Sequence, residues 1–295
     1  MHQHLIVGLL GPTLTSEEKQ WLSLMPPLGV ILFARNIETP EQVSSLLADV
    51  RHCTGANSWA AIDEEGGRVN RIPWPPFSGR RHAAEFGRMF ERNAGTAIQS
   101  VFQDSLMAGE ALKELGFSHN CAPVLDVFSD SGHAIIGERA YSSDIGVASV
   151  LAMACRRGLE AAGVEAVGKH FPGHGRADAD SHVAVPHVDA SLEQLLSEAE
   201  TFVDLVQDGL QHIMTAHVIY NQVRPDVATL SEFWLKDILR QRMGFSGCIW
   251  SDDLCMKGVG ENVPDAAQAS LQAGCDALLV CEPEGVRTMF ETLQA

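Results

Sequence analysis

The chain has 295 residues, and its content of 45% hydrophobic and 20% charged residues is typical of a soluble globular protein. The formal net charge of −17 argues against a nucleic-acid or anionic-membrane partner, and no apolar run approaches the roughly 18 residues of a membrane span. The seven cysteines form no CxxC pair and the opening MHQHLIVGLLGP lacks the features of a signal peptide, so we expect a reduced, cytoplasmic protein without a disulfide framework.

Short apolar or β-branched segments recur along the whole chain, with longer amphipathic segments between them. Their nearly continuous apolar character is typical of strands that are buried on both faces of a parallel sheet. We predict strands at residues 4–10, 29–35, 59–65, 117–127, 165–171, 212–220, 247–253 and 277–281.

The clearest helix signal follows the second predicted strand, in TPEQVSSLLADVRHC. Thr39 has the side chain of an N-cap, Pro40 stands at the first helical position, and apolar residues then recur at helical spacing. Similar patterns predict helices at about 96–115, 145–162, 191–209, 231–243 and 264–273. Two long segments, at about 66–94 and 172–190, are predicted as loops, and long loops in a compact domain are usually functional or disordered.

Eight strands that alternate with helices, without any break in composition, predict one (β/α)8 barrel over residues 1–295. Few residues follow the last predicted strand, so we expect a short closing helix. A doubly wound open sheet is the alternative. Ionisable residues favour the barrel, because they cluster where predicted strands end and would meet at one mouth: Asp63, Asp126, Lys169, His170, His217, Asp252 and Asp253.

The stretch GKHFPGHGRADADSH, at 168–182, is dense in groups that can bind a metal or transfer a proton. His170 and His174 have a spacing that binds zinc on a helix, but Pro172 and Gly173 stand between them, so we expect no metal site there. The histidines of HQH, at 2–4, precede the first strand and are predicted at the opposite end of the barrel.

An acid/base role suits the same stretch better. Asp180 lies two residues before His182, close enough to orient its imidazole, and an ordinary histidine pKa of about 6.5 suits proton transfer near neutral pH. From spacing alone, a solvated surface loop is an equal alternative. Of Asp252 and Asp253, strand alternation allows at most one to face the mouth. There the carboxylate would be a nucleophile, a base or the partner of a cation.

Seven motifs, taken together and in order, carry a resemblance: AIDEEGGRVNR, APVLDV, IGERAY, GKHFPGHGRADADSH, TAHVIY, GFSGCIWSDDLCM and QASLQAGCDALLVC. With them the chain resembles the single-domain β-N-acetylhexosaminidases of glycoside hydrolase family 3, from about residue 5 to its end. The resemblance implies a (β/α)8 barrel and a retaining, two-step β-N-acetylglucosaminidase. The Gly-Gly turn of the first motif lets Arg68 or Arg71 fold back over the mouth, although a surface position for Arg71 is the alternative.

The resemblance also implies roles for individual residues. Asp252 would be the nucleophile, His182 the general acid/base and Asp180 its partner. Five further residues would bind the sugar, namely Asp63, Arg71, Arg139, Lys169 and His170. No metal or organic cofactor is implied.

The implied substrate is terminal, non-reducing N-acetylglucosamine on cell-wall muropeptides, such as N-acetylglucosaminyl-1,6-anhydro-N-acetylmuramic acid with or without its peptide. The enzyme would act in the cytoplasm as a monomer during peptidoglycan recycling. Three alternatives stay open: a route in which the substrate's acetamido oxygen is the nucleophile, a metal-dependent amidohydrolase-type barrel, and a catalytically inactive sugar-binding barrel.

Overall fold

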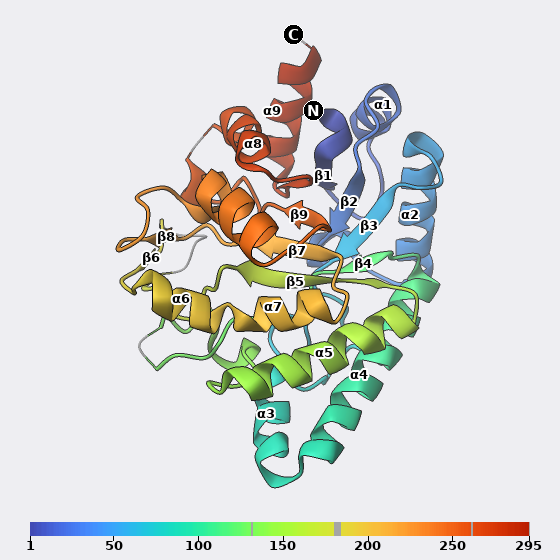
Figure 1. Cartoon of the computed structure of the whole chain (residues 1–295). Coiled ribbons are helices and arrows are strands. Elements are labelled where there is room, and N and C mark those ends of the chain that lie inside the picture. The colour runs from blue at the N-terminus through green and yellow to red at the C-terminus, as the bar shows by residue number, and fades with distance from the viewer. Residues whose placement is uncertain (131, 180–183, 261, 295) are drawn as a thin grey trace.

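The protein is a nearly closed barrel of eight parallel strands with helices packed around it (Figure 1). The computed structural model describes residues 1–130, 132–179, 184–260 and 262–294. The barrel strands are β1 (Leu5–Gly8), β2 (Gly29–Leu32), β3 (Trp59–Ile62), β4 (His119–Asn120), β5 (Glu165–Phe171), β7 (His212–Thr215), β9 (Cys248–Trp250) and β10 (Leu278–Val280).

The sheet runs in the order β10-β1-β2-β3-β4-β5-β7-β9, and a parallel bridge between Trp250 and Ala277 joins its two ends. The predicted (β/α)8 barrel is therefore confirmed, and the open sheet is wrong. All eight predicted strands are present, and β5 has the predicted bounds. The other seven are shorter than predicted, because the sequence patterns run on beyond the residues that pair with a neighbouring strand.

The helices that surround the barrel are α1 (Ser16–Leu24), α2 (Pro40–Thr54), α3 (Ala83–Arg92), α4 (Ala94–Leu115), α5 (Ile145–Ala161), α6 (Leu192–Glu198), α7 (Glu200–Gln207), a π-helix (Phe233–Arg242), α8 (Val263–Ala273) and α9 (Pro283–Gln294). Thr39 caps α2 as predicted, since its side chain accepts a hydrogen bond from the Gln42 N–H. The helix predicted at 191–209 is divided at Ala199 into α6 and α7.

The two predicted loops contain structure that the sequence patterns did not indicate. Residues 66–94 include the whole of α3, where Gly87 weakens the helix signal. A Cβ at Gly87 would lie 1.9 Å from the Tyr141 carbonyl oxygen, so only glycine permits this approach. Residues 172–190 include the short strand β6 (His187–Val188), which pairs with β8 (Ile219–Tyr220) as a second, two-stranded sheet.

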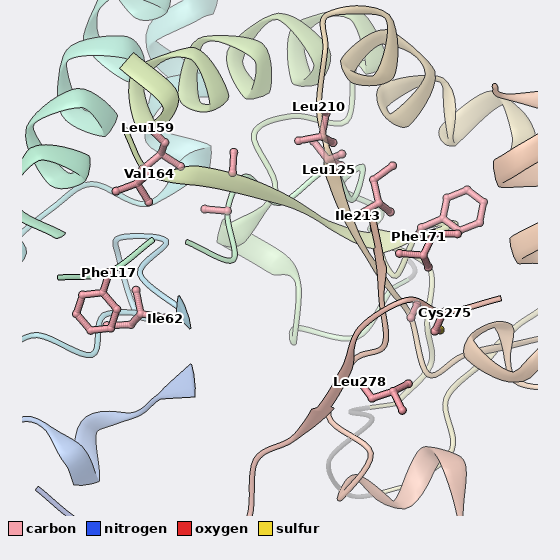
Figure 2. Packing of buried hydrophobic residues seen from close by; sticks show 14 of the residues in the cluster. Ile62, Phe117, Leu125, Leu159, Val164, Phe171, Leu210, Ile213, Cys275 and Leu278 are labelled. Atoms are coloured by element: carbon pink, nitrogen blue, oxygen red, sulfur yellow. The ribbon is translucent and has the colours of Figure 1, made fainter. Parts of the chain in front are cut away.

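The core has two layers. Ile6, Ile31, Val167 and other residues fill the inside of the barrel. A larger layer lies between the strands and the helices, and Figure 2 shows part of it. In this outer layer Phe171 of β5 meets Phe202 of α7 edge to face, with ring centroids 5.3 Å apart.

The last helix completes the ring of helices beside the first. Phe290 of α9 stacks on Trp21 of α1, with ring centroids 5.4 Å apart. Figure 1 places α9 next to α8, close to the N-terminal end of the chain. Among the described residues, no helix combines the length and apolar character that crossing a membrane requires.

Candidate active site

A cavity of about 560 Å³ opens where the barrel strands end. The described site residues that the sequence predicts all lie in its wall, namely Asp63, Arg71, Arg139, Lys169, His170 and Asp252. Asp180 and His182, the predicted acid/base pair, lie outside the described residues. The carboxyl ends of the strands thus bring together side chains that are up to 189 positions apart in sequence, from Asp63 to Asp252.

Lys169 is the centre of an ionic cluster at the bottom of this cavity. Its Nζ lies 2.6 Å from Asp63 Oδ1 and 2.6 Å from Glu65 Oε1, and only 2% of the residue is exposed. Burial lowers the pKa of this amine, but the two carboxylates raise it by more, so that Lys169 stays charged. Arg139 donates two hydrogen bonds to Glu65, both of 2.8 Å. The cluster presents fixed charges to the cavity.

Asp63 remains ionised although it is largely buried. Burial raises its pKa, but Lys169 and then Arg71 lower it below the ordinary value. Arg71 Nη2 lies 3.5 Å from Asp63 Oδ2, which is a loose contact, and Arg71 Nε is buried without a partner among the described residues. Among the described residues, Asp63 Oδ2 therefore has only this loose contact and can accept a hydrogen bond from a ligand.

The turn after β3 explains how Arg71 reaches the cavity. Gly66 and Gly67 have φ values of +90° and +59°, the region that favours glycine, and the chain folds back as predicted. Glu64 points away from the mouth, and its Oε2 accepts hydrogen bonds from the Arg71 N–H (2.8 Å) and the Ile72 N–H (3.3 Å). Burial raises the pKa of Glu64 to about 7.

Arg68, the other arginine of this turn, has a different role from Arg71. Its guanidinium donates to the backbone carbonyls of residues 134–136, including that of Ala134 at 2.9 Å. Ile135 and Ile136 lie in the cavity wall. Arg68 thus holds one side of the mouth in place.

Asp126 orients His170 from behind. Its Oδ2 lies 2.7 Å from His170 Nδ1, and its Oδ1 accepts a 2.6 Å hydrogen bond from the His174 N–H. Burial raises the pKa of Asp126, but His170 lowers it below the ordinary value. Asp126 is therefore ionised, and its carboxylate accepts a hydrogen bond from the N–H at His170 Nδ1. With Nδ1 as the donor, Nε2 of His170 is the nitrogen left for a ligand.

Asp252 and Asp253 lie beyond the end of β9, so strand alternation does not govern them. Both touch the cavity, but Asp253 Oδ1 accepts hydrogen bonds from the Cys255 N–H (3.0 Å) and the Cys281 N–H (2.9 Å). Asp252 accepts one bond, from the Asp253 N–H at 2.8 Å. Burial raises the pKa of Asp252, but His217 and His170 lower it below the ordinary value. Within the part of the chain that the structure describes, Asp252 is therefore an ionised carboxylate with one oxygen that accepts no hydrogen bond.

Sequence reasoning missed three residues that shape the site. Glu65 shares Lys169 with Asp63, and both residues lie beyond the end of β3, where strand alternation gives no signal. Asp126 was noted only as one of the charges at a strand end. His174 lines the cavity, and burial lowers its pKa to about 4, so that its imidazole is neutral.

The arrangement suits a ligand that carries many hydroxyl groups. Charged donors such as Lys169 and Arg139 and charged acceptors such as Asp63 lie together in the cavity wall. Within the described ranges, no three His, Cys, Asp or Glu side chains gather as a metal site would require. The fold and the site define a barrel enzyme with a carboxylate ready to attack or to stabilise a positive centre.

Known proteins agree with this class. The family model of the glycosyl hydrolase family 3 N-terminal domain matches residues 5–295. The chain is 40% identical over 295 residues to the β-hexosaminidase of Methylobacillus flagellatus, a match that covers 98% of this chain and 84% of the relative. The chain belongs to glycosyl hydrolase family 3 and is a glycoside hydrolase, which confirms the resemblance.

Solved structures show the same likeness. The structure of NagZ from Neisseria gonorrhoeae in complex with N-trifluoroacetyl-D-glucosamine has a TM-score of 0.91 and 34% identity, covering 99% of this chain and 85% of that chain. A family 3 β-N-acetylglucosaminidase from Paenibacillus sp. str. FPU-7 has a TM-score of 0.88 and 30% identity, covering 99% of this chain and 56% of that chain.

Proposed function

We propose that this protein is a retaining, exo-acting β-N-acetylglucosaminidase. It would hydrolyse terminal, non-reducing N-acetylglucosamine through a covalent intermediate on Asp252. The names of its relatives support the sugar, since one similar structure is titled a β-N-acetylglucosaminidase and another holds an N-acylated glucosamine. The observation that carries the mechanism is the ionised Asp252 in the wall of the cavity.

The ionic cluster would bind the sugar ring. Asp63 accepts hydrogen bonds from sugar hydroxyls, while Lys169, Arg139 and Arg71 donate to hydroxyl or acetamido oxygens. His170 offers the nitrogen that its bond to Asp126 leaves free. Because these groups are already paired and held in place, they need little reorganisation when the sugar binds.

The reaction would proceed in two displacements. The Asp252 carboxylate attacks the anomeric carbon and forms an ester, while His182 donates its proton to the departing glycosidic oxygen. His182 then takes a proton from water, whose oxygen attacks the anomeric carbon and releases Asp252. Asp180 would hold the imidazole in the required tautomer. Here a histidine and aspartate pair stands in for the second carboxyl group that most glycosidases use.

Hydrolysis of 4-nitrophenyl N-acetyl-β-glucosaminide tests the proposal. We expect turnover by the native protein and a loss of more than about 10³-fold in Asp252→Ala, because a covalent route then has no nucleophile. Asp237→Ala, which removes an exposed aspartate from the π-helix, is the matched control and should keep full activity. A native protein that binds N-acetylglucosamine without hydrolysing any glycoside would instead be a sugar-binding barrel.

A fluorinated N-acetylglucosaminide separates the covalent route from the substrate-assisted one. In the covalent route the sugar is found on the peptide that contains Asp252. Turnover without any adduct would mean that the acetamido oxygen acts as the nucleophile. The metal-dependent alternative is tested by exhaustive chelation, after which we expect full activity. A loss of activity that added zinc reverses would contradict our proposal.

We further propose that the cellular substrate is a muropeptide, cleaved in the cytoplasm during peptidoglycan recycling, and that the enzyme is a monomer. Mass spectrometry should detect N-acetylglucosamine released from N-acetylglucosaminyl-1,6-anhydro-N-acetylmuramic acid, with and without its peptide. Sedimentation at several concentrations measures the oligomeric state.

A further inference from the structure

His217 is a fully buried histidine that lies just beyond the end of β7 and outside the cavity wall. Its Nε2 lies 3.0 Å from the carbonyl oxygen of Asp253, and its Nδ1 lies 2.8 Å from Thr229 Oγ1. A carbonyl oxygen can only accept, so Nε2 carries the proton and donates it to Asp253. Both ring nitrogens therefore have partners, and one partner is the residue that follows Asp252.

Asp253 connects this histidine to the proposed nucleophile. The Asp253 N–H donates a 2.8 Å hydrogen bond to Asp252 Oδ1, and the Asp253 carboxylate accepts the N–H groups of Cys255 and Cys281. The turn is thus held from three directions: by its own next residues, by the end of β10, and by His217 after β7. His217 reaches the turn from the neighbouring strand, since β7 pairs with β9.

We propose that His217 is a positioning residue that holds the turn after β9 and thereby sets the direction of the Asp252 carboxylate. The inference rests on the proposed role of Asp252 as nucleophile. It assigns no contact between His217 and the sugar. A displacement of about 1 Å in a reacting group costs up to about 10²-fold in rate, so a single hydrogen bond that fixes this turn has a measurable effect.

The surroundings of the ring leave it little freedom to move. A Cβ at Gly258 would lie 2.8 Å from His217 Cβ, so the chain after the turn packs directly against the histidine. On the other side, Thr229 Oγ1 lies 2.8 Å from Thr215 Oγ1 and 3.0 Å from the Ala216 carbonyl oxygen. The hydroxyl groups of Thr215 and Thr229 therefore tie the ring to the backbone that leaves β7.

Two amide substitutions distinguish the hydrogen bond from mere filling of space. The amide nitrogen of glutamine reaches the place of Nε2, whereas that of asparagine reaches only the place of Nδ1. His217→Gln therefore keeps the donor to Asp253, and His217→Asn loses it. We expect kcat for the chromogenic glucosaminide to fall about 10- to 100-fold in His217→Asn and less than about 5-fold in His217→Gln. KM should stay within about twofold in both, because His217 does not touch substrate.

Thr229→Val provides a second measurement that leaves the histidine in place. It removes the hydroxyl beside Nδ1, and we expect kcat to fall about 3- to 10-fold with KM unchanged. His52→Asn, at an exposed histidine of α2, is the matched control and should behave as the native protein does. If His217→Asn does not fold, Thr229→Val decides the question.

Several outcomes would overturn the proposal. Equal kcat values in His217→Asn and His217→Gln would show that the hydrogen bond to Asp253 does not affect catalysis. An unchanged kcat in Thr229→Val would show that the orientation of the His217 ring does not affect catalysis either. A rise in KM that matches the loss of kcat would show a general distortion of the sugar site. If the native protein is active and Asp252→Ala is not, each of these results contradicts only the role of His217. An inactive native protein would contradict the proposed function itself.

Discussion

Both ends of the barrel contain buried histidines, but the histidines have different partners at each end. At the amino ends of the strands, Trp59 lies against His119 (ring centroids 4.3 Å apart). Trp250 is the last residue of β9, but its indole donates a 3.1 Å hydrogen bond to Nδ1 of His212, the first residue of β7. Burial lowers the pKa values of His119 and His212 to about 3 and about 4, so both are neutral. At the carboxyl ends, the cavity wall holds many charged groups beside apolar residues such as Phe33 and Met214.

The difference between the ends follows from how each satisfies its polar atoms. The bottom layer pairs neutral rings with one another and closes the barrel by packing. At the mouth, charged side chains form ion pairs, which offsets the cost of burying them. Several of these side chains also have a donor or acceptor atom that can bond a ligand. Substitutions at the bottom should therefore change stability alone, and substitutions at the mouth should change activity first. Four predictions test this contrast.

The largest effect should follow from Lys169→Met. The change removes the cation between Asp63 and Glu65 and leaves two buried carboxylates that repel each other. We expect kcat/KM to fall at least about 10³-fold and the free energy of unfolding to fall by roughly 3–5 kcal/mol. Steady-state kinetics and urea unfolding measure the two quantities. Lys236→Met, at a surface lysine that pairs with Glu232 on the π-helix, is the control and should change neither by much.

Trp59→Ala makes the corresponding change at the bottom. It removes a partly exposed ring that stacks on Trp250 and His119, so we expect a loss of roughly 2–4 kcal/mol in the free energy of unfolding. The kcat and KM of the folded protein should match the native values at a temperature well below its midpoint. A fall in kcat of tenfold or more would show that the bottom layer positions the catalytic groups, and the contrast between the ends would be wrong.

Asp126→Asn tests orientation within the mouth. The amide group cannot accept hydrogen bonds at both of the positions where Asp126 now accepts them from His170 and His174. We expect kcat/KM to fall about 10- to 100-fold, with most of the loss in KM because His170 is placed against the sugar. Isothermal titration with N-acetylglucosamine measures the binding directly. Native affinity in this variant would contradict the role of Asp126.

The smallest expected effect is on how the free energy of unfolding depends on pH, and it has opposite signs for a group at each end. His119 has a folded pKa of about 3 against an ordinary 6.5, so the unfolded chain binds the proton first and stability falls as pH drops from about 6.5 towards 3. Glu64 has a folded pKa of about 7 against 4.5, so the unfolded chain loses its proton first and stability falls as pH rises from about 4.5 to 7.

Two variants isolate these contributions. His119→Phe should flatten the loss of unfolding free energy on the acid side, and Glu64→Gln should flatten the loss between about pH 5 and 7. Each difference from the native protein should amount to roughly 1–3 kcal/mol, since one pKa unit corresponds to about 1.4 kcal/mol. Urea unfolding at several pH values measures it. If Glu64→Gln retains the native slope, then Glu64 is ionised in the folded protein, and Arg80 (3.7 Å from its Oε1) is its counter-ion.

Most of the fold could be predicted because its signals are local. Buried parallel strands show as continuous apolar runs, and Thr39 with Pro40 marks the start of α2 without reference to any other part of the chain. The failures have a tertiary cause. α3 was missed because Gly87, a poor helix former, is there for the close approach of the Tyr141 carbonyl oxygen, which lies 54 residues away in sequence. The ends of all the barrel strands except β5 were placed too late, because pairing, rather than apolar character, decides where a strand stops.

By itself the sequence determined the eight-strand barrel, the end of it that carries the polar residues, and the motifs that mark the family. These depend on periodicity and residue type, which a single chain displays along its length. The tertiary structure decided the pairing: Lys169 with both Asp63 and Glu65, His170 with Asp126, and His217 with the turn that carries Asp252. Such partners lie 36 to 106 residues apart. Only the closure of the barrel brings them within hydrogen-bonding distance.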